Sequence, residues 1–266
     1  DTNIDIKTSI NVANALGAGF RYIESENKLL NIGRQKVSGK VTADCSESGS
    51  TLRFFIPVAA ALGINTVFTG HGRLPERPVD IYKGLLEDHG VTAEFTGKGI
   101  PLKRKGKLQG GLFELPGDVS SQFISGLLFA LPVLKGDSEI KLTTKIESKQ
   151  YIDLTISVLS RYGIKIDETK TGYKVKGGQS YVPVNSSVEG DWSHAAFLLS
   201  MAAISGKEIM IGGLDENSVQ GDRTCVDIYR QFGLDIAFEK GILRAKNENY
   251  EKPFSGLKAI RLDAGE

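Results

Sequence analysis

The sequence has few of the residues that mark disulfide-stabilised, metal-binding or nucleic-acid-binding proteins. It contains two cysteines, three histidines and one tryptophan among 266 residues. The two cysteines, Cys45 and Cys225, are too few for a disulfide framework and stand in no metal-ligand spacing, so we expect a reducing, cytoplasmic location and no metal site. The net charge of +1 lacks the basic excess that nucleic acid or an anionic membrane surface requires.

Several signatures of membrane insertion and catalysis are also missing. The apolar stretch at residues 123–134 is too short to span a bilayer, which needs about 20 apolar residues. There is no GxSxG nucleophile elbow, no P-loop and no HExxH zinc motif. With 40% hydrophobic and 24% charged residues, the composition predicts a soluble globular protein with a large core and one or two domains.

What the sequence does contain is a repeat with a period of about 70 residues. Three apolar helices that open on small polar residues resemble one another, at residues 47–63, 117–134 and 190–206. Four glycines that each follow an amphipathic helix recur at the same interval: Gly17, Gly90, Gly163 and Gly233. Each period is predicted to hold a helix, a strand, a second helix and two strands. Such modules predict a compact α/β fold, because a thin solenoid has a shorter repeat.

The patterns of apolar residues assign elements to each repeat. Helices are predicted at residues 8–16, 48–62, 78–90, 120–134, 151–163, 194–205 and 224–233. Strands are predicted at residues 20–25, 28–33, 64–70, 139–144, 208–213 and 259–265, and hairpins at residues 91–106, 164–178 and 234–247. Both ends of the chain fall inside a repeat, so the array is expected to be truncated at both ends. Residues 177–189 are predicted to cross between two domains, residues 1–188 and residues 189–266.

Polar side chains crowd the predicted start of the third-repeat helix. Ser120, Ser121 and Gln122 occupy a first turn whose free N–H groups and dipole favour an anion. One hydroxyl is enough for an N-cap, so the surplus favours an anionic or hydroxyl-bearing ligand over the alternative of a plain cap. Ser148 and Tyr151 open the next helix in a similar way.

Two basic clusters have competing interpretations. Arg73 and Arg77 stand just before a helix predicted to start at Pro78, where the helix dipole disfavours a cation. An anionic ligand would compensate them, and so would an ion pair with Glu76 or another carboxylate. A second run is typical of a solvated hairpin edge that discourages aggregation: Lys103, Arg104, Lys105 and Lys107.

Six motifs together resemble the 5-enolpyruvylshikimate-3-phosphate synthase family of enolpyruvyl transferases. They follow the order of that family: ESGSTLR, GRLPERP, PGDVSSQF, SKQYID, EGDWSHAAF and NSVQGDR. The resemblance implies an inside-out α/β barrel fold with two domains, each built from three βαβαββ units. It also implies transfer of the enolpyruvyl group of phosphoenolpyruvate to the 5-hydroxyl of shikimate 3-phosphate, with release of phosphate and without a cofactor. This is a step of chorismate and aromatic amino-acid biosynthesis.

The matched motifs imply particular ligand contacts. Those for shikimate 3-phosphate, on the first domain, are Ser120, Ser121, Gln122, Ser148 and Tyr151. Those for phosphoenolpyruvate are Ser48, Gly49, Ser50, Arg77 and Gln122. Glu47 stands where many members of the family have asparagine. The resemblance further implies glyphosate as an inhibitor, a monomer when full length, and neither nucleic acid nor membrane as a partner.

Part of the catalytic apparatus of that family matches no segment of this sequence. Its lysine-serine-arginine segment would precede Asp1 and its general-base aspartate would follow Glu266, so the catalytic residues are unknown. We expect the 266-residue chain to bind shikimate 3-phosphate weakly and to show no measurable transferase activity. One alternative is a non-catalytic binding module. Another is an enzyme similar to UDP-N-acetylglucosamine enolpyruvyl transferase, whose usual reactive cysteine is absent from the loop at residues 70–78.

Overall fold

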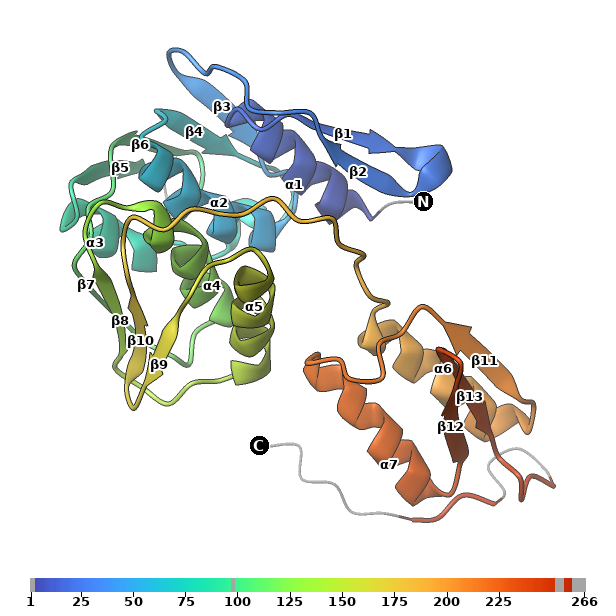
Figure 1. Cartoon of the computed structure of the whole chain (residues 1–266). Coiled ribbons are helices and arrows are strands. Elements are labelled where there is room, and N and C mark those ends of the chain that lie inside the picture. The colour runs from blue at the N-terminus through green and yellow to red at the C-terminus, as the bar shows by residue number, and fades with distance from the viewer. Residues whose placement is uncertain (1–2, 97–98, 252–255, 260–266) are drawn as a thin grey trace. The chain divides into compact units, whose positions relative to one another are not determined.

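A computed structural model of the chain is shown in Figure 1 and describes residues 3–96, 99–251 and 256–259. The chain separates into two compact units, Asp1–Pro183 and Val184–Glu266. The predicted strand at residues 259–265 lies outside the described residues except for Ala259, and so do residues 97 and 98 of the predicted hairpin at residues 91–106. Within the described part of the chain, no helix is long and apolar enough to cross a membrane.

Two complete repeats follow one another in the first unit and share one topology. The first consists of β3 (Val41–Asp44), α2 (Gly49–Leu62), β4 (Thr66–Thr69), α3 (Ile81–Glu87), β5 (Val91–Phe95) and β6 (Leu102–Gly106). The second consists of β7 (Leu112–Leu115), α4 (Ser121–Ala130), β8 (Ser138–Leu142), α5 (Lys149–Arg161), β9 (Asp167–Thr169) and β10 (Gly172–Val175). The sheet orders are β3-β4-β6-β5 and β7-β8-β10-β9, each with one parallel pair followed by antiparallel pairs. The predicted βαβαββ unit is therefore confirmed.

Partial repeats stand on either side of these two. The first unit begins with the second half of a repeat, which consists of α1 (Ile4–Ala15) and an antiparallel hairpin of β1 (Phe20–Ile23) and β2 (Lys28–Asn31). The second unit contains α6 (Trp192–Ser205), β11 (Ile209–Gly212), α7 (Cys225–Phe232), β12 (Asp235–Glu239) and β13 (Ile242–Lys246). Its sheet order, β11-β13-β12, matches the last three strands of a complete repeat.

The recurring glycines have a common backbone conformation. Gly17, Gly90, Gly163 and Gly233 have φ of 93°, 82°, 81° and 105°, each where the chain leaves a helix for a hairpin. Residues with a Cβ rarely adopt this left-handed region, and glycine adopts it freely. The interval of the glycines is thus the interval of the repeat.

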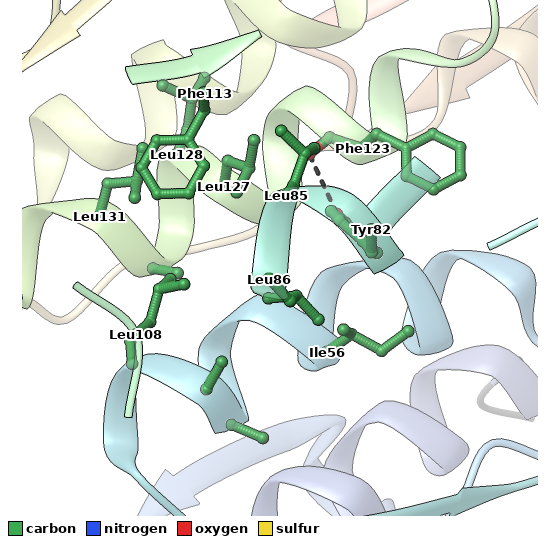
Figure 2. Packing of buried hydrophobic residues seen from close by; sticks show 14 of the residues in the cluster. Ile56, Tyr82, Leu85, Leu86, Leu108, Phe113, Phe123, Leu127, Leu128 and Leu131 are labelled. Carbon is green, nitrogen blue, oxygen red and sulfur yellow. Dashed lines mark hydrogen bonds between the residues drawn. The ribbon is translucent and has the colours of Figure 1, made fainter. Parts of the chain in front are cut away.

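The helices α2 and α4 form the centre of the first unit. α2 packs against α1 and α4, and α4 packs in addition against α5. Phe123, Ile124, Leu127 and Leu128 of α4 are all buried, which confirms that this helix, apolar nearly all round, is covered on its sides. Figure 2 shows Leu127 and Leu128 within a cluster that also includes side chains of α2 and α3. The second unit has a separate, smaller core.

Three details of the prediction were wrong for local reasons. The strands β3 and β7 were not predicted, because each is a four-residue segment that is defined by its partner strand and not by its own pattern. α4 ends at Ala130, because Pro132 cannot continue an α-helix and a 3-10 turn, η3 (Leu131–Val133), follows. α3 starts at Ile81 and not at Pro78. The described strands form open sheets, so no closed barrel is seen among the described residues.

The basic run on β6 is only partly a solvated edge. The side chains of Lys103 and Lys105 are exposed, whereas Arg104 between them is 2% exposed. The alternation of a strand places Arg104 on the inner face of the sheet. The expectation of a uniformly solvated basic edge is therefore wrong at this residue.

Candidate functional site

The N-termini of α2, α4 and α5 lie at the same end of the first unit. Near the start of α2, Arg53 donates from Nη1 to Oε1 of Gln122 in the first turn of α4, at 2.7 Å. Ser125 of α4 and Thr155 of α5 share a hydroxyl hydrogen bond of 2.8 Å. The loops that lead into α4 and α5 are also joined, because the amide of Glu147 donates to the carbonyl of Gly117 at 3.0 Å. Three sets of free helix N–H groups therefore gather in one place.

Hydroxyl groups line the first turns of α2 and α4. Ser48 is the N-cap of α2 and accepts from the amide of Thr51, while its Oγ lies 3.2 Å from that of Ser50. Ser120 is the N-cap of α4 and accepts from the amide of Gln122 at 3.3 Å. These two serines therefore serve as structural caps, whatever else they contact. Ser50, like Gln122, is not needed as a cap.

The side chain of Arg53 was not singled out from the sequence, yet it lies at the centre of this cluster. Its Nη2 donates to the carbonyl of Pro78 at 3.3 Å, and its guanidinium lies 5.0 Å from the ring centroid of Phe123. Burial lowers the pKa of Arg53, and the nearby positive charge of Arg77 lowers it further. The signal that was missed is a charged residue one turn inside an otherwise apolar helix, within the motif ESGSTLR.

Arg77 reaches the same place from the loop after β4. A 3-10 turn, η2 (Leu74–Glu76), precedes it, and the buried side chain of Leu74 anchors that turn. A Cβ atom on Gly49 would lie 2.6 Å from Nη1 of Arg77, so the absence of a side chain on Gly49 leaves room for the guanidinium against the first residue of α2. Arg77 is exposed, and it stands four residues before α3. The sequence led us to expect an unfavourable interaction between Arg77 and the dipole of the following helix. The unfavourable interaction in the structure is instead the repulsion between the positive charges of Arg77 and Arg53.

Neither arginine is neutralised by a carboxylate within the described residues. The salt bridges found there involve other cations, and none joins Arg53 or Arg77 to an acidic side chain. Nε of Arg53 is buried without a hydrogen-bond partner. Two adjacent guanidinium groups without a counterion favour the binding of an anion.

The start of α5 differs in its electrostatics. Lys149 is paired with Asp153 at 2.6 Å and with Glu168 at 3.3 Å, and these two acids raise the pKa of Lys149. Ser148 has a left-handed backbone, with φ of 57°, and makes no side-chain cap bond. Tyr151 is 50% exposed. The hydroxyls of Ser148 and Tyr151 are therefore accessible to a ligand. At this end of the site, the positive charge of Lys149 is already paired with acidic side chains.

The structure brings most of the predicted site residues together in two groups. The first is held by the contacts of α2, α4 and the arginine loop, which is the loop at residues 70–80 that carries Arg77: Ser48, Gly49, Ser50, Arg77, Ser120 and Gln122. The second, Ser148 with Tyr151, lies at the start of α5, next to α4. Ser121 is 8% exposed, the least accessible of the predicted hydroxyls on α4. Among the described residues, no group of three or more His, Cys, Asp or Glu side chains is placed to hold a metal ion.

This chain is similar to proteins of one enzyme family. A model of the family described as EPSP synthase (3-phosphoshikimate 1-carboxyvinyltransferase) matches residues 2–261. The 3-phosphoshikimate 1-carboxyvinyltransferase of Clostridium kluyveri is 42% identical over 239 residues, which are 89% of this chain and 55% of that protein. The protein of the same name from Clostridium novyi is 38% identical over 273 residues, and the match covers 98% of this chain and 60% of that protein.

A solved structure shows the same fold. EPSP synthase from Acinetobacter baumannii matches 90% of this chain and 55% of its own chain, with a TM-score of 0.71 and 20% sequence identity. At that identity the likeness supports the fold alone. The chain spans 55% to 60% of the length of the relatives named here.

Proposed function

The chain belongs to the EPSP synthase family, and on this premise we propose that its site serves the transfer of an enolpyruvyl group from phosphoenolpyruvate to the 5-hydroxyl of shikimate 3-phosphate. In this reaction the methylene carbon of phosphoenolpyruvate is protonated and the 5-hydroxyl oxygen attacks the adjacent carbon. Loss of phosphate and of a methyl proton then restores the double bond. The reaction belongs to the biosynthesis of aromatic amino acids.

The observation that carries this proposal is the pair of neighbouring arginines, Arg53 and Arg77, that meet no carboxylate in the part of the chain that the structure describes. Phosphoenolpyruvate is a small polyanion, and the guanidinium groups of Arg53 and Arg77 offer it several N–H donors beside the first turn of α2. We assign Ser48, Gly49 and Ser50 to the same subsite. Free backbone N–H groups at this helix N-terminus would add donors to the anion.

Shikimate 3-phosphate is assigned to the neighbouring subsite. Its ligands are proposed to be Ser120, Ser121 and Gln122 on α4, with Ser148 and Tyr151 on α5. The hydrogen bond between Arg53 and Gln122 supports this division, because it joins a residue assigned to one subsite to a residue assigned to the other. Adjacent subsites bring the reacting hydroxyl and the enolpyruvyl carbon together, which is what a bimolecular transfer requires. Residues 1–188 are accordingly proposed as the domain that binds shikimate 3-phosphate.

Isothermal titration calorimetry tests the binding half of this proposal. We expect shikimate 3-phosphate to bind the chain and shikimate, which lacks the phosphate, to bind at least about tenfold more weakly, since charge-assisted hydrogen bonds are the strong ones. Equal binding of the two compounds, or no binding of either, would contradict the assignment. Phosphate release with both substrates present then tests the expectation that the 266-residue chain alone shows no measurable transfer. Glyphosate is expected to compete with phosphoenolpyruvate for binding. The cytoplasmic location and the monomeric state of the full-length protein stay predictions.

A further inference from the structure

We propose that Glu47 is a positioning residue for Arg77, an inference that rests on the proposed function of the arginine site. Glu47 stands in the loop between β3 and α2, and Arg77 follows η2 in the loop between β4 and α3. The carboxylate of Glu47 holds the second loop in the position from which its arginine reaches the anion. Nothing in the family resemblance assigns a role to a glutamate here, because many members have asparagine.

The two loops start from neighbouring strands. β3 and β4 are parallel, with Asp44 opposite Thr69, so both chains leave the sheet at the same edge. The amide of Cys45 donates to the carbonyl of Thr69 at 2.8 Å, and the amide of His71 donates to the carbonyl of Ser46 at 2.8 Å. These backbone bonds fix the beginning of the arginine loop. They end at His71, six residues before Arg77.

The side chain of Glu47 continues the contact where the backbone bonds stop. Its Oε1 lies 3.5 Å from Nδ1 of His71. The carboxylate also lies flat against Gly72, since a Cβ atom there would be 1.9 Å from Oε1 and 2.4 Å from Cδ. Gly72 has φ of 60°, so the backbone turns at this point toward η2 and Arg77. Glu47 therefore contacts the bend that sets the direction of the arginine segment.

The same two loops meet a second time at Gly49 and Arg77. A Cβ atom on Gly49 would lie 2.6 Å from Nη1 of Arg77. Glu47 and Gly49 are two residues apart in the first loop. In the arginine loop, the bend at Gly72 is likewise close along the chain to the 3-10 turn that precedes Arg77. A displacement of the bend at Gly72 would therefore move the guanidinium away from the first turn of α2. This is why we assign Glu47 to positioning and not to direct contact with the anion.

The experiment compares Glu47→Ala with Glu47→Gln in two measurements. Calorimetric titration with phosphoenolpyruvate should show affinity reduced about threefold to fivefold by Glu47→Ala, the ratio expected of an exposed contact. Glu47→Gln, which keeps the length and polarity of the side chain, should restore the affinity. Binding of shikimate 3-phosphate should be unchanged in both variants. Affinity for phosphoenolpyruvate that is unchanged or increased in Glu47→Ala would overturn the proposal, because Glu47 would then be only a surface charge.

Amide hydrogen exchange gives a second readout that needs no ligand. The amides of Leu74, Glu76 and Arg77 are bonded within the turn of the arginine loop. We expect Glu47→Ala to speed their exchange about threefold or more, while the amides of β4 keep their rates. Unchanged exchange in the loop would overturn the proposal. If neither the original chain nor any variant bound phosphoenolpyruvate, the proposed function would fail. The rate of amide exchange in Glu47→Ala would still test the contact of Glu47 with the arginine loop.

Gly72→Ala provides an independent variant with a matched control. Its Cβ atom would displace the carboxylate of Glu47, so it should reduce phosphoenolpyruvate affinity as Glu47→Ala does, and the two changes together should not add. Gly39→Ala is the control for backbone strain, because Gly39 has φ of 77° and nothing within 4 Å of the position of its Cβ atom. Fully additive effects of Gly72→Ala and Glu47→Ala would contradict a shared contact.

Discussion

Arg53 donates from Nη1 to Oε1 of Gln122 at 2.7 Å, and this bond joins two consecutive repeats of the chain. The helices that carry these residues, α2 and α4, are equivalent elements of successive βαβαββ units. The site is therefore built at a junction between repeats, and neither repeat carries it alone. A substitution at this junction is therefore expected to change ligand affinity more than it changes the folding of either repeat.

The first prediction concerns the shape of the Arg53 side chain. Arg53→Lys keeps the positive charge, but an ammonium group cannot reach Gln122 and the carbonyl of Pro78 at the same time. We expect phosphoenolpyruvate to bind about tenfold more weakly in calorimetry, a change of roughly 1.4 kcal/mol. Arg161→Lys, at an exposed position on α5, is the control and should bind like the original chain. Equal affinity in Arg53→Lys would mean that charge alone suffices.

The second prediction separates ligand contacts from helix capping on α4. The double variant Ser121→Ala with Gln122→Ala should weaken shikimate 3-phosphate binding without unfolding the chain, because Ser120 still caps the helix. Ser120→Ala should instead lower the free energy of unfolding by about 0.5–2 kcal/mol, the usual cost of a lost N-cap. Calorimetric titration and urea unfolding measure the two effects. Unchanged affinity with a large fall in stability of the double variant would show that the cluster is only structural.

The third prediction concerns the close approach of α2 and α4. Pro57 has no N–H to donate to the carbonyl of Arg53, and the hydroxyl of Tyr82 lies 2.9 Å from that carbonyl and 3.0 Å from the carbonyl of Phe123. Figure 2 shows the second of these contacts. A Cβ atom on Gly126 would lie 2.5 Å from the Tyr82 hydroxyl and 2.6 Å from the Arg53 carbonyl.

Gly126→Ala should therefore destabilise the fold by about 1–3 kcal/mol, as overpacking of a filled core does. Gly84→Ala is the matched control, because Gly84 lies inside α3 with nothing within 4 Å of the position of its Cβ atom. Gly84→Ala should raise the free energy of unfolding by up to about 1 kcal/mol, which is the difference in helix propensity between alanine and glycine. Thermal or urea unfolding of both variants measures the difference. Equal effects of the two changes would mean that the two helices can separate without cost.

Local patterns in the sequence predicted the local elements well, and contacts between repeats poorly. The left-handed glycines and the serine caps depend on neighbours within a few residues, so their positions were correct. The partner of Arg53 lies 69 residues away, and no local period carries that information. The strands β3 and β7 could not be predicted from local patterns either, since their parallel pairing with β4 and β8 defines them. The resemblance to a known family supplied the roles proposed for individual residues, which spacing alone had left open.

The burial of Arg104 was the least expected feature, and it leads to the last prediction. The inner position on β6 leaves Nε and Nη1 of Arg104 without hydrogen-bond partners among the residues that the structure describes, while Nη2 donates to the carbonyl of Gly106 at 2.7 Å. Burial lowers the pKa of Arg104 to about 10. Because the folded state disfavours the charged form, the unfolded chain binds more protons above this pH, and the free energy of unfolding should gain a contribution as pH rises above about 10. Below about pH 10 the folded chain carries the full cost of the buried charge.

Arg104→Met removes that charge and keeps an unbranched apolar side chain of similar reach. We expect it to raise the free energy of unfolding at pH 7 by about 1–3 kcal/mol, as replacement of a buried charge by a hydrophobic residue often does. Near pH 11 the difference between the two proteins should shrink, because the original chain has by then lost part of the cost. Urea unfolding at the two pH values measures both quantities, and lysine and tyrosine titrations cancel in the comparison. A less stable Arg104→Met at pH 7 would show instead that the bond to Gly106 and the packing of the arginine stem outweigh the desolvation of its charge.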